Sequence, residues 1–426
     1  METSNPAWLA DGMAHVWRPY CQMKTASMPL AVERTSGAEI RLADGRGLVD
    51  GIASWWTACH GYNHPHITQS VAEQLTRMPH IMFGGLAHEP AYRLATRLAA
   101  LLPGDLNHVF FAESGSVAVE IAMKMAVQYW LNRGVQGRVH FLSFLGGYHG
   151  DTFATMSICD PEEGMHTIFN NVVPTQHVVA LPLDEAREQA LDDYLARHAA
   201  EIAAIVVEPL VQGAGGMRMH APAVLQTLRG LADRHGVLLI FDEIFTGFGR
   251  TGTMFAMQQA GVEPDIVTLS KALTGGVLPL SAAVASDAVF DAFWSDNPLG
   301  ALMHGPTYMA NPLGCAAANA SLDLFEDGAW RARVAGIAQQ LRDGLAPCRD
   351  LPGVVDVRVL GAIGAVEVSE RINLKRVGAA CLAAGCFIRP FGRIVYLTPA
   401  FIIGAAELAR LCAAIVEAVA GGYDEA

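Results

Sequence analysis

The stretches VLLIFDE (residues 237–243) and DIVTLSKALTGG (residues 265–276) decide the expected fold. Each contains a short, continuous apolar run, which is typical of a strand buried on both faces of a parallel sheet. Asp242 stands at the end of the first run, and Lys271 follows the second. Because open α/β sheets bind ligands outside the carboxyl ends of their strands, we expect this carboxylate and this amine to face one ligand.

Strand-like and helix-like segments alternate from about residue 90 to 325, which predicts an α/β fold with a mostly parallel sheet covered on both faces. The last hundred residues predict a smaller α+β domain, with a strand-like stretch VVDVRVLGAIGAVEV between two helices. Near the N-terminus, EIRLADGRGLVDG predicts a hairpin that turns at Asp44 and Gly45. We therefore expect an N-terminal segment (1–60) packing with the small domain, a large ligand-binding domain (61–325) and a small C-terminal domain (326–426).

The composition narrows the function classes. Hydrophobic residues make up 52% of the chain and charged residues 17%, as in a well-buried globular protein. The net charge of -13 argues against nucleic-acid and anionic-membrane partners. The start, METSNPAWLADGMAHVW, lacks the pattern of a secretory signal, and no apolar stretch is long enough to span a bilayer. The 8 cysteines form no CxxC pair, so we expect reduced thiols in a cytoplasmic protein.

Lys271 and Asp242 together favour pyridoxal phosphate (PLP) as the ligand. This cofactor needs a lysine for its Schiff base and an acidic partner for its pyridinium nitrogen. Partial burial lowers the pKa of an amine and makes it nucleophilic. Each residue alone has a plainer interpretation: Lys271 as a surface lysine, and Asp242 as a helix cap or as the partner of Arg250 in a structural salt bridge.

A phosphate site is predicted where ESGS (residues 113–116) joins a strand to a helix. The N–H groups of Gly115 and Ser116 at a helix start attract anions, although an ordinary strand-to-helix turn with a serine cap has the same pattern. In the glycine-rich loop GGYHGDT (146–152), Tyr148 suits stacking on a pyridine ring, the alternative being a half-buried tyrosine in a plain turn.

Two patterns suggest other chemistry and carry less weight. GFGRTG (247–252) matches the G-x-G-x-x-G dinucleotide fingerprint, but it does not open a clear helix, and Asp265 begins the next strand instead of ending one. His60, His64 and His66 lack the spacing of helical or cysteine-paired metal ligands, so we predict no metal site and interpret them as turn and interface residues.

The sequence as a whole resembles the class III (omega-type) aminotransferases of the fold-type I PLP-dependent enzymes. The resemblance covers nearly the whole chain and rests on EPLVQGAGG, FDEIFTGFGRTG, TLSKALTGG and HGPTYMANPLGCAAANASL. WRPYCQM, SWWTACHGYNHP, HIMFGGLAH, GYHGDT and IRPFGRIVYLTP are similar to one branch of the family. That branch converts 8-amino-7-oxononanoate to 7,8-diaminononanoate in biotin biosynthesis, with S-adenosylmethionine, or lysine in some members, as amino donor.

The resemblance implies a role for each matching residue. Lys271 would form the Schiff base and move protons, Asp242 would hold the pyridine nitrogen, and Tyr148 and Ile244 would cover the two faces of the ring. The phosphate would be bound by Gly115 and Ser116 and, from the neighbouring subunit of a homodimer, by Pro306 and Thr307. The substrate pocket would be lined by Tyr20, Trp55, Trp56, Tyr148, Lys271 and Gly305, with Arg389 on the substrate carboxylate.

The implied reaction is a ping-pong transamination, in which one pocket serves two unlike substrates in turn. Two tryptophans offer apolar surface for an aliphatic chain, and a guanidinium grips a carboxylate. Phe245 stands where close relatives have a small residue. Three other functions remain open from the sequence: a class III enzyme for ornithine, lysine, 4-aminobutyrate or a beta-amino acid; a nucleotide-dependent oxidoreductase; and a non-catalytic binding protein.

Overall fold

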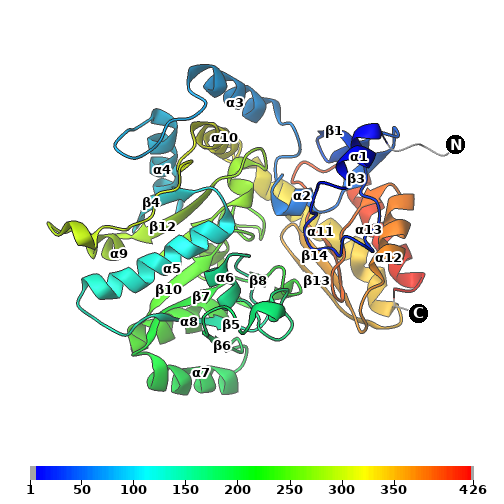
Figure 1. The fold of residues 1–426 in the computed structure, drawn as a ribbon. Coiled ribbons are helices and arrows are strands. Elements are labelled where there is room, and N and C mark those ends of the chain that lie inside the picture. The colour runs from blue at the N-terminus through cyan, green and yellow to red at the C-terminus, as the bar shows by residue number, and fades with distance from the viewer. Residues whose placement is uncertain (1–5, 424–426) are drawn as a thin grey trace.

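A computed structural model describes residues 6–423 and shows an α/β protein built around one large mixed sheet (Figure 1). This 7-stranded sheet has the order β4-β12-β11-β10-β7-β5-β6, and β12 is antiparallel to both of its neighbours. Its strands are β4 (Leu106–Ala112), β5 (His140–Phe144), β6 (His177–Val179), β7 (Ile202–Val207), β10 (Leu238–Asp242), β11 (Ile266–Leu269) and β12 (Ser281–Ser286). The predicted mostly parallel sheet is confirmed.

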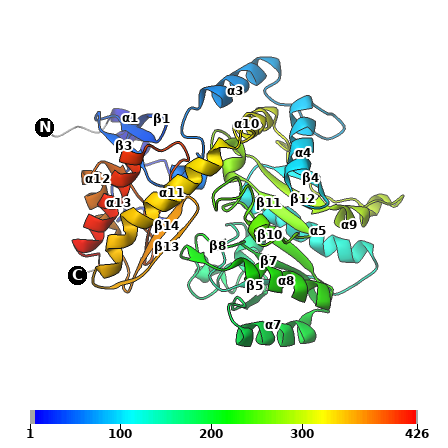
Figure 2. The same cartoon turned by 180° about the vertical axis from the view of Figure 1, so that it is seen from behind.

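Helices cover both faces of this sheet, as the continuous apolar runs require. The long helix α5 (Gly115–Asn132) packs across the strands on one face, and α8 (Pro222–His235) packs on β10 (Figure 2). The other helices of this part of the chain are α3 (Pro65–Arg77), α4 (Glu89–Leu101), α6 (Phe153–Ser157), α7 (Glu185–His198), α9 (Asp287–Asp291) and α10 (Pro312–Asp323). A short ribbon of β8 (Val211–Gln212) and β9 (Arg218–Met219) follows β7.

The C-terminal part forms a second layered unit with its own antiparallel sheet. It contains β13 (Val354–Leu360), β14 (Ile363–Val368) and β16 (Ile394–Leu397), packed against α11 (Ala329–Leu345), with α12 (Leu374–Ala383) and α13 (Ala405–Ala420) beside it. The strand-like stretch VVDVRVLGAIGAVEV divides into two strands. The chain turns between them at Gly361, whose φ of 54° lies in the left-handed region that favours glycine, and a Cβ there would lie 2.5 Å from the Arg250 carbonyl oxygen.

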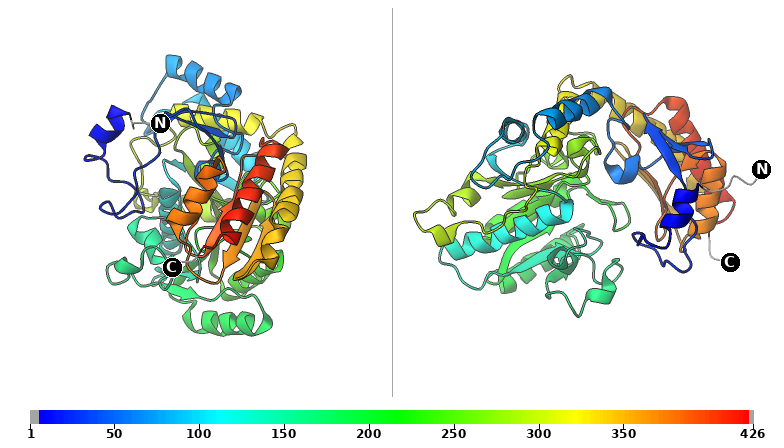
Figure 3. Two further views of the ribbon diagram at one scale, coloured as in Figure 1. Left: turned by 90° about the vertical axis from the view of Figure 1, so that its right-hand side faces the viewer. Right: turned by 45° about the horizontal axis from the view of Figure 1, so that its top comes forward.

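The N-terminal segment joins the C-terminal unit through strand pairing. The predicted hairpin consists of β2 (Glu39–Leu42) and β3 (Gly47–Asp50), with β1 (Val32–Ser36) on its outer side, and β3 pairs in parallel with β15 (Cys386–Phe387). Figure 3 shows this segment, with α1 (Ala7–Gly12), beside the C-terminal helices. We propose domain boundaries near residues 60 and 325; residues 1–5 and 424–426 of the outer domains lie outside the described residues.

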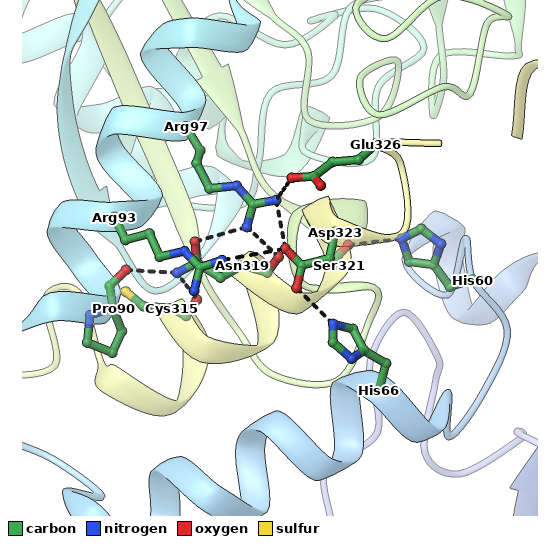
Figure 4. A network of polar contacts seen from close by, with 10 residues as sticks. All are labelled: His60, His66, Pro90, Arg93, Arg97, Cys315, Asn319, Ser321, Asp323 and Glu326. Atoms are coloured by element: carbon green, nitrogen blue, oxygen red, sulfur yellow. Dashed lines mark hydrogen bonds and ion pairs between the residues drawn. The ribbon is translucent and has the colours of Figure 1, made fainter. Parts of the chain in front are cut away.

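A polar network fixes the helices that stand above the large sheet. Asp323, the last residue of α10, forms ion pairs of 2.8 Å with His66 of α3 and with Arg97 of α4 (Figure 4). His60 is buried, and its Nε2 lies 3.0 Å from the Ser321 hydroxyl of α10. Of the three histidines in ACHGYNHPHI, His60 and His66 therefore contact separate partners in this network.

Candidate active site

Asp242 and Lys271 lie near each other because they stand at the carboxyl ends of two neighbouring strands of the large sheet. Strands β10 and β11 run parallel, with Asp242 opposite Thr268, and Lys271 comes two residues after β11 ends. Lys271 has a φ of 47°, an uncommon conformation for a residue with a side chain. Such strain is found where the surroundings hold a residue for function.

The amine of Lys271 is enclosed by aromatic side chains. Its Nζ lies 4.4 Å from the centre of the Trp56 ring and 6.0 Å from that of Phe245. Burial lowers the pKa of this amine to about 8, although Asp242 and other nearby carboxylates oppose the effect. The ion pair recorded for Asp242 is with His149 and not with Lys271. A neutral, nucleophilic amine is therefore accessible close to neutral pH.

Asp242 is held by a histidine and not by Arg250. Its Oδ2 lies 2.7 Å from His149 Nδ1, and both side chains are buried. Burial lowers the pKa of His149, but the hydrogen bond to Asp242 and the charge of this carboxylate outweigh it and raise the pKa above its ordinary value. Arg250 instead donates to the carbonyl oxygens of Ala362 and Pro399, so the alternative salt bridge to Asp242 is absent.

The helix start at Gly115 has the features of an anion site. Ser114 caps α5, and its Oγ accepts a hydrogen bond from the Val117 N–H. The N–H groups of the first helical turn have no partners within the helix. A Cβ at Gly115 would lie 3.1 Å from Ile244 Cδ1, so glycine keeps the space beside the helix start open. Ser116 Oγ accepts from the Asp151 N–H.

Tyr148 belongs to a hydrogen-bonded cluster centred on Asp151. The hydroxyl groups of Tyr20 and Tyr148 both donate to this carboxylate, and His166 Nε2 lies 2.8 Å from it. The Tyr148 N–H donates to the buried Glu208 carboxylate at 3.0 Å. Burial raises the pKa of Tyr20 to about 12, so its hydroxyl stays protonated and able to donate.

The two tryptophans occupy a left-handed turn and have different surroundings. Ala53, Ser54, Trp55 and Trp56 all have positive φ. Trp56 is buried against Phe245, with ring centres 4.2 Å apart, whereas Trp55 is 37% exposed and lies 4.8 Å from the Arg389 guanidinium. Tyr20 meets the edge of Trp55 at 6.0 Å. Tyr20, Trp55 and Arg389 thus form one exposed surface next to the buried Trp56 and the half-buried Lys271.

The carboxylate of Asp50 stabilises this turn through hydrogen bonds to its backbone. Its carboxylate accepts hydrogen bonds from the Ile52 and Ser54 N–H groups, each at 2.8 Å, and from the Tyr62 hydroxyl at 2.6 Å. Asp50 is buried, so these bonds hold the turn in place. Sequence reasoning missed Asp50, His149 as a partner of Asp242, and Asp151. The loop GGYHGDT contained the last two, but their partners become adjacent only in the folded chain.

Gly305, Pro306 and Thr307 belong to a segment without regular secondary structure, and Thr307 is exposed. GFGRTG forms turns followed by the short 3-10 helix Ala256–Gln259, so the long helix that a dinucleotide fingerprint requires does not follow it.

A family model for class III aminotransferases matches residues 20–419. The chain belongs to the class III aminotransferases. An adenosylmethionine-8-amino-7-oxononanoate aminotransferase from Corynebacterium glutamicum is 43% identical over 98% of this chain and 99% of its own length. One from Mycobacterium leprae is 46% identical over 96% and 95%.

Solved class III aminotransferases have the same fold. An adenosylmethionine-8-amino-7-oxononanoate aminotransferase from Methanocaldococcus jannaschii superposes with a TM-score of 0.91 at 30% identity, over 98% of both chains. An omega-transaminase from Thermomicrobium roseum gives the same TM-score and identity over 99% of both chains. An amine transaminase from an uncultivated Pseudomonas species was solved in a PLP-bound form.

Pyridoxal phosphate is the cofactor of this family, and the residues of this aminotransferase fit it. A buried carboxylate suits the pyridinium nitrogen, a low-pKa lysine suits the aldehyde, and the open helix start suits the phosphate.

None of the helices between residues 6 and 423 has both the length and the apolar character needed to cross a membrane.

Proposed function

We propose that this protein transfers an amino group to 8-amino-7-oxononanoate, giving 7,8-diaminononanoate for biotin biosynthesis, with S-adenosylmethionine as donor. The observation that carries the proposal is the exposed surface formed by Tyr20, Trp55 and Arg389 beside Lys271. Among the described residues, Arg389 has no carboxylate partner, so its guanidinium is free for a substrate carboxylate. Relatives named for this reaction, at 37–46% identity, support the proposal.

The substrate matches this surface in polarity. An aliphatic chain lies against the Trp55 ring while its terminal carboxylate binds Arg389, which places the far keto group toward Lys271. Tyr20 and Tyr148, held by Asp151, offer hydroxyl groups to the polar end of either substrate. The indole of Trp56 and the ring of Phe245 exclude water around the amine.

Residues of the chain divide the chemical work. When bound, pyridoxal phosphate withdraws electrons from the carbon that carries the amino group, which makes the proton on this carbon acidic. Asp242, oriented by His149, would hold the pyridine nitrogen protonated, and Gly115 and Ser116 would hold the phosphate. Ile244 and Tyr148 would cover the ring faces. Lys271 Nζ takes the proton from the donor and returns one to the acceptor in the second half of a ping-pong cycle.

We further propose a homodimer in which Pro306 and Thr307 of the partner subunit complete the phosphate site and Gly305 borders the substrate pocket. The segment before Thr307 exposes large apolar side chains, with Leu299 86% and Met303 78% exposed, as expected of an interface. Dilution that separates the subunits should abolish activity; a fully active monomer would contradict the shared site.

Because the described cysteines are all free, we place the enzyme in the cytoplasm, which cell fractionation tests.

The direct experiment incubates purified enzyme with 8-amino-7-oxononanoate and either S-adenosylmethionine or lysine, and detects 7,8-diaminononanoate by mass spectrometry. We expect product with S-adenosylmethionine and none with Lys271→Ala. Solved omega-transaminases of similar fold favour a second candidate, a general amine transaminase. Rapid turnover of 4-aminobutyrate or another simple amine without diaminononanoate would reject the proposal in favour of this second function.

A further inference from the structure

Two histidines and a glutamate lie close together where strands of the large sheet begin, whereas Asp242 lies where a strand ends. His177 begins β6, His198 ends α7, and Glu201 immediately precedes β7. Strands β6, β7 and β10 run in parallel, so strand starts and strand ends lie at opposite edges. The cluster is therefore separate from the aminotransferase site, which lies at the strand ends.

The possible ligand atoms of the three side chains lie close together. Glu201 Oε1 lies 2.7 Å from His198 Nδ1 and 3.6 Å from His177 Nε2. The three ligand atoms all lie within 4.8 Å of one another. Ligands bound at about 2.0–2.2 Å to one tetrahedral zinc ion have comparable separations, so small side-chain shifts suffice to bring them onto a metal.

Neighbouring groups hold these ligands in place. The Tyr194 hydroxyl lies 2.7 Å from His177 Nδ1, which leaves Nε2 directed at Glu201. Histidine ligands of metals usually have such a partner on the second ring nitrogen. The Glu201 carbonyl accepts hydrogen bonds from the N–H groups of Val139 and His140, each at 3.0 Å, which anchors its backbone.

The charge and exposure of the cluster also suit a cation. Among residues 6–423, Glu201 forms ion pairs only with these two histidines, so no lysine or arginine neutralises it. The His177 side chain is 14% exposed and that of Glu201 45%, so an ion can enter from solvent and keep a water ligand. The nearby Arg197 lies over the ring of Tyr194, 6.0 Å from its centre. Its charge therefore contacts Tyr194 and forms no ion pair with Glu201.

We propose that His177, His198 and Glu201 form a zinc site with water as the fourth ligand. Two imidazoles and one carboxylate are an established ligand set for this ion. The bound ion would tie the edge strand β6 to the end of α7 and the start of β7. The sequence did not reveal the site, because its histidines lie on different elements and lack a metal-binding spacing.

The test uses the PLP-loaded enzyme after dialysis against a chelator, titrated calorimetrically with zinc chloride. We expect one saturable equivalent of zinc. His177→Ala and Glu201→Gln should each weaken binding by about tenfold or more, and Tyr194→Phe, which keeps all ligands, by about tenfold. His66→Ala is the matched control, because it removes a histidine paired with a carboxylate elsewhere, and it should bind as the unchanged protein does.

Cofactor absorbance and unfolding temperature check that each variant is folded. Zinc should also raise the unfolding temperature of the unchanged enzyme and not that of His177→Ala, because an ion that binds only the folded state stabilises it. In a crystal soaked with zinc, anomalous density should lie between His177 and Glu201. Weak, unsaturable uptake, equal affinity in His177→Ala, or anomalous density elsewhere would overturn the proposal.

Discussion

His149 Nδ1 lies 2.7 Å from Asp242 Oδ2, and both side chains are buried at the end of β10. The pair joins the carboxylate that we propose to face the cofactor to the loop that carries Tyr148. A hydrogen bond from His149 fixes the position of this carboxylate, which a charge-assisted contact to a pyridine nitrogen requires.

His149→Ala should therefore raise the activation free energy of the reaction by more than it lowers the free energy of unfolding, so that the main effect is a lower kcat. A hydrogen bond to a buried charge contributes about 1.5–3 kcal/mol, which corresponds to roughly 10–100-fold in rate if the bond acts in the transition state. Steady-state kinetics and urea unfolding measure the two effects. His108→Ala, which removes a partly exposed histidine paired with Asp287, is the control. An unchanged kcat in His149→Ala would show that the pair has no part in catalysis.

The low pKa of Lys271 predicts a pH-dependent reactivity. In cofactor-free enzyme, acylation of Lys271 by an amine-reactive reagent should reach half of its maximal rate near the pKa of about 8. Peptide mass spectrometry measures the label, with unfolded protein as the reference. A midpoint near the ordinary value of 10.5 would contradict the burial effect.

The same pKa shift has a consequence for stability. Because the folded pKa lies below the unfolded one, the unfolded state binds more protons between them, and the stability of cofactor-free enzyme should rise as the pH increases from about 8 to 10.5. Lys271→Met should lose this rise. Urea unfolding at several pH values measures it, and a rise of equal size in the variant would assign it to other groups.

Gly115→Ala should weaken cofactor binding through contact with Ile244. The new Cβ would lie 3.1 Å from Ile244 Cδ1, closer than ordinary packing. We expect a roughly tenfold weaker PLP affinity, corresponding to about 1.4 kcal/mol, measured by absorbance titration. Ile244→Val in the same chain removes the crowding Cδ1 and should restore part of the affinity. Equal affinities in all variants would argue against this steric role.

Asp50→Asn should loosen the turn that carries the tryptophans. The amide cannot accept all three hydrogen bonds that the carboxylate receives, and leaving a buried donor unpaired costs about 1–3 kcal/mol. We expect lower stability in urea and a higher KM for the oxononanoate substrate. Asp44→Asn at the exposed end of the same hairpin is the control. A KM that stays constant would separate Asp50 from substrate binding.

The closeness of Asp242 and Lys271 could be predicted, because neighbouring parallel strands have their carboxyl ends at the same end of the sheet. Ser114 as a helix cap followed equally from a strand, a small polar residue and a helix in order. The His149–Asp242 pair could not be predicted, because it depends on how the loop after β5 folds back over β10. The left-handed turn at Trp55 was also hidden, since its conformation depends on bonds to Asp50 and not on glycine.

The most direct test of the central assignment is borohydride reduction of PLP-loaded enzyme followed by peptide mass spectrometry. The account predicts the cofactor mass on the peptide that contains Lys271, and no fixed cofactor in Lys271→Ala. Cofactor attached to a different lysine in the unchanged protein would contradict it.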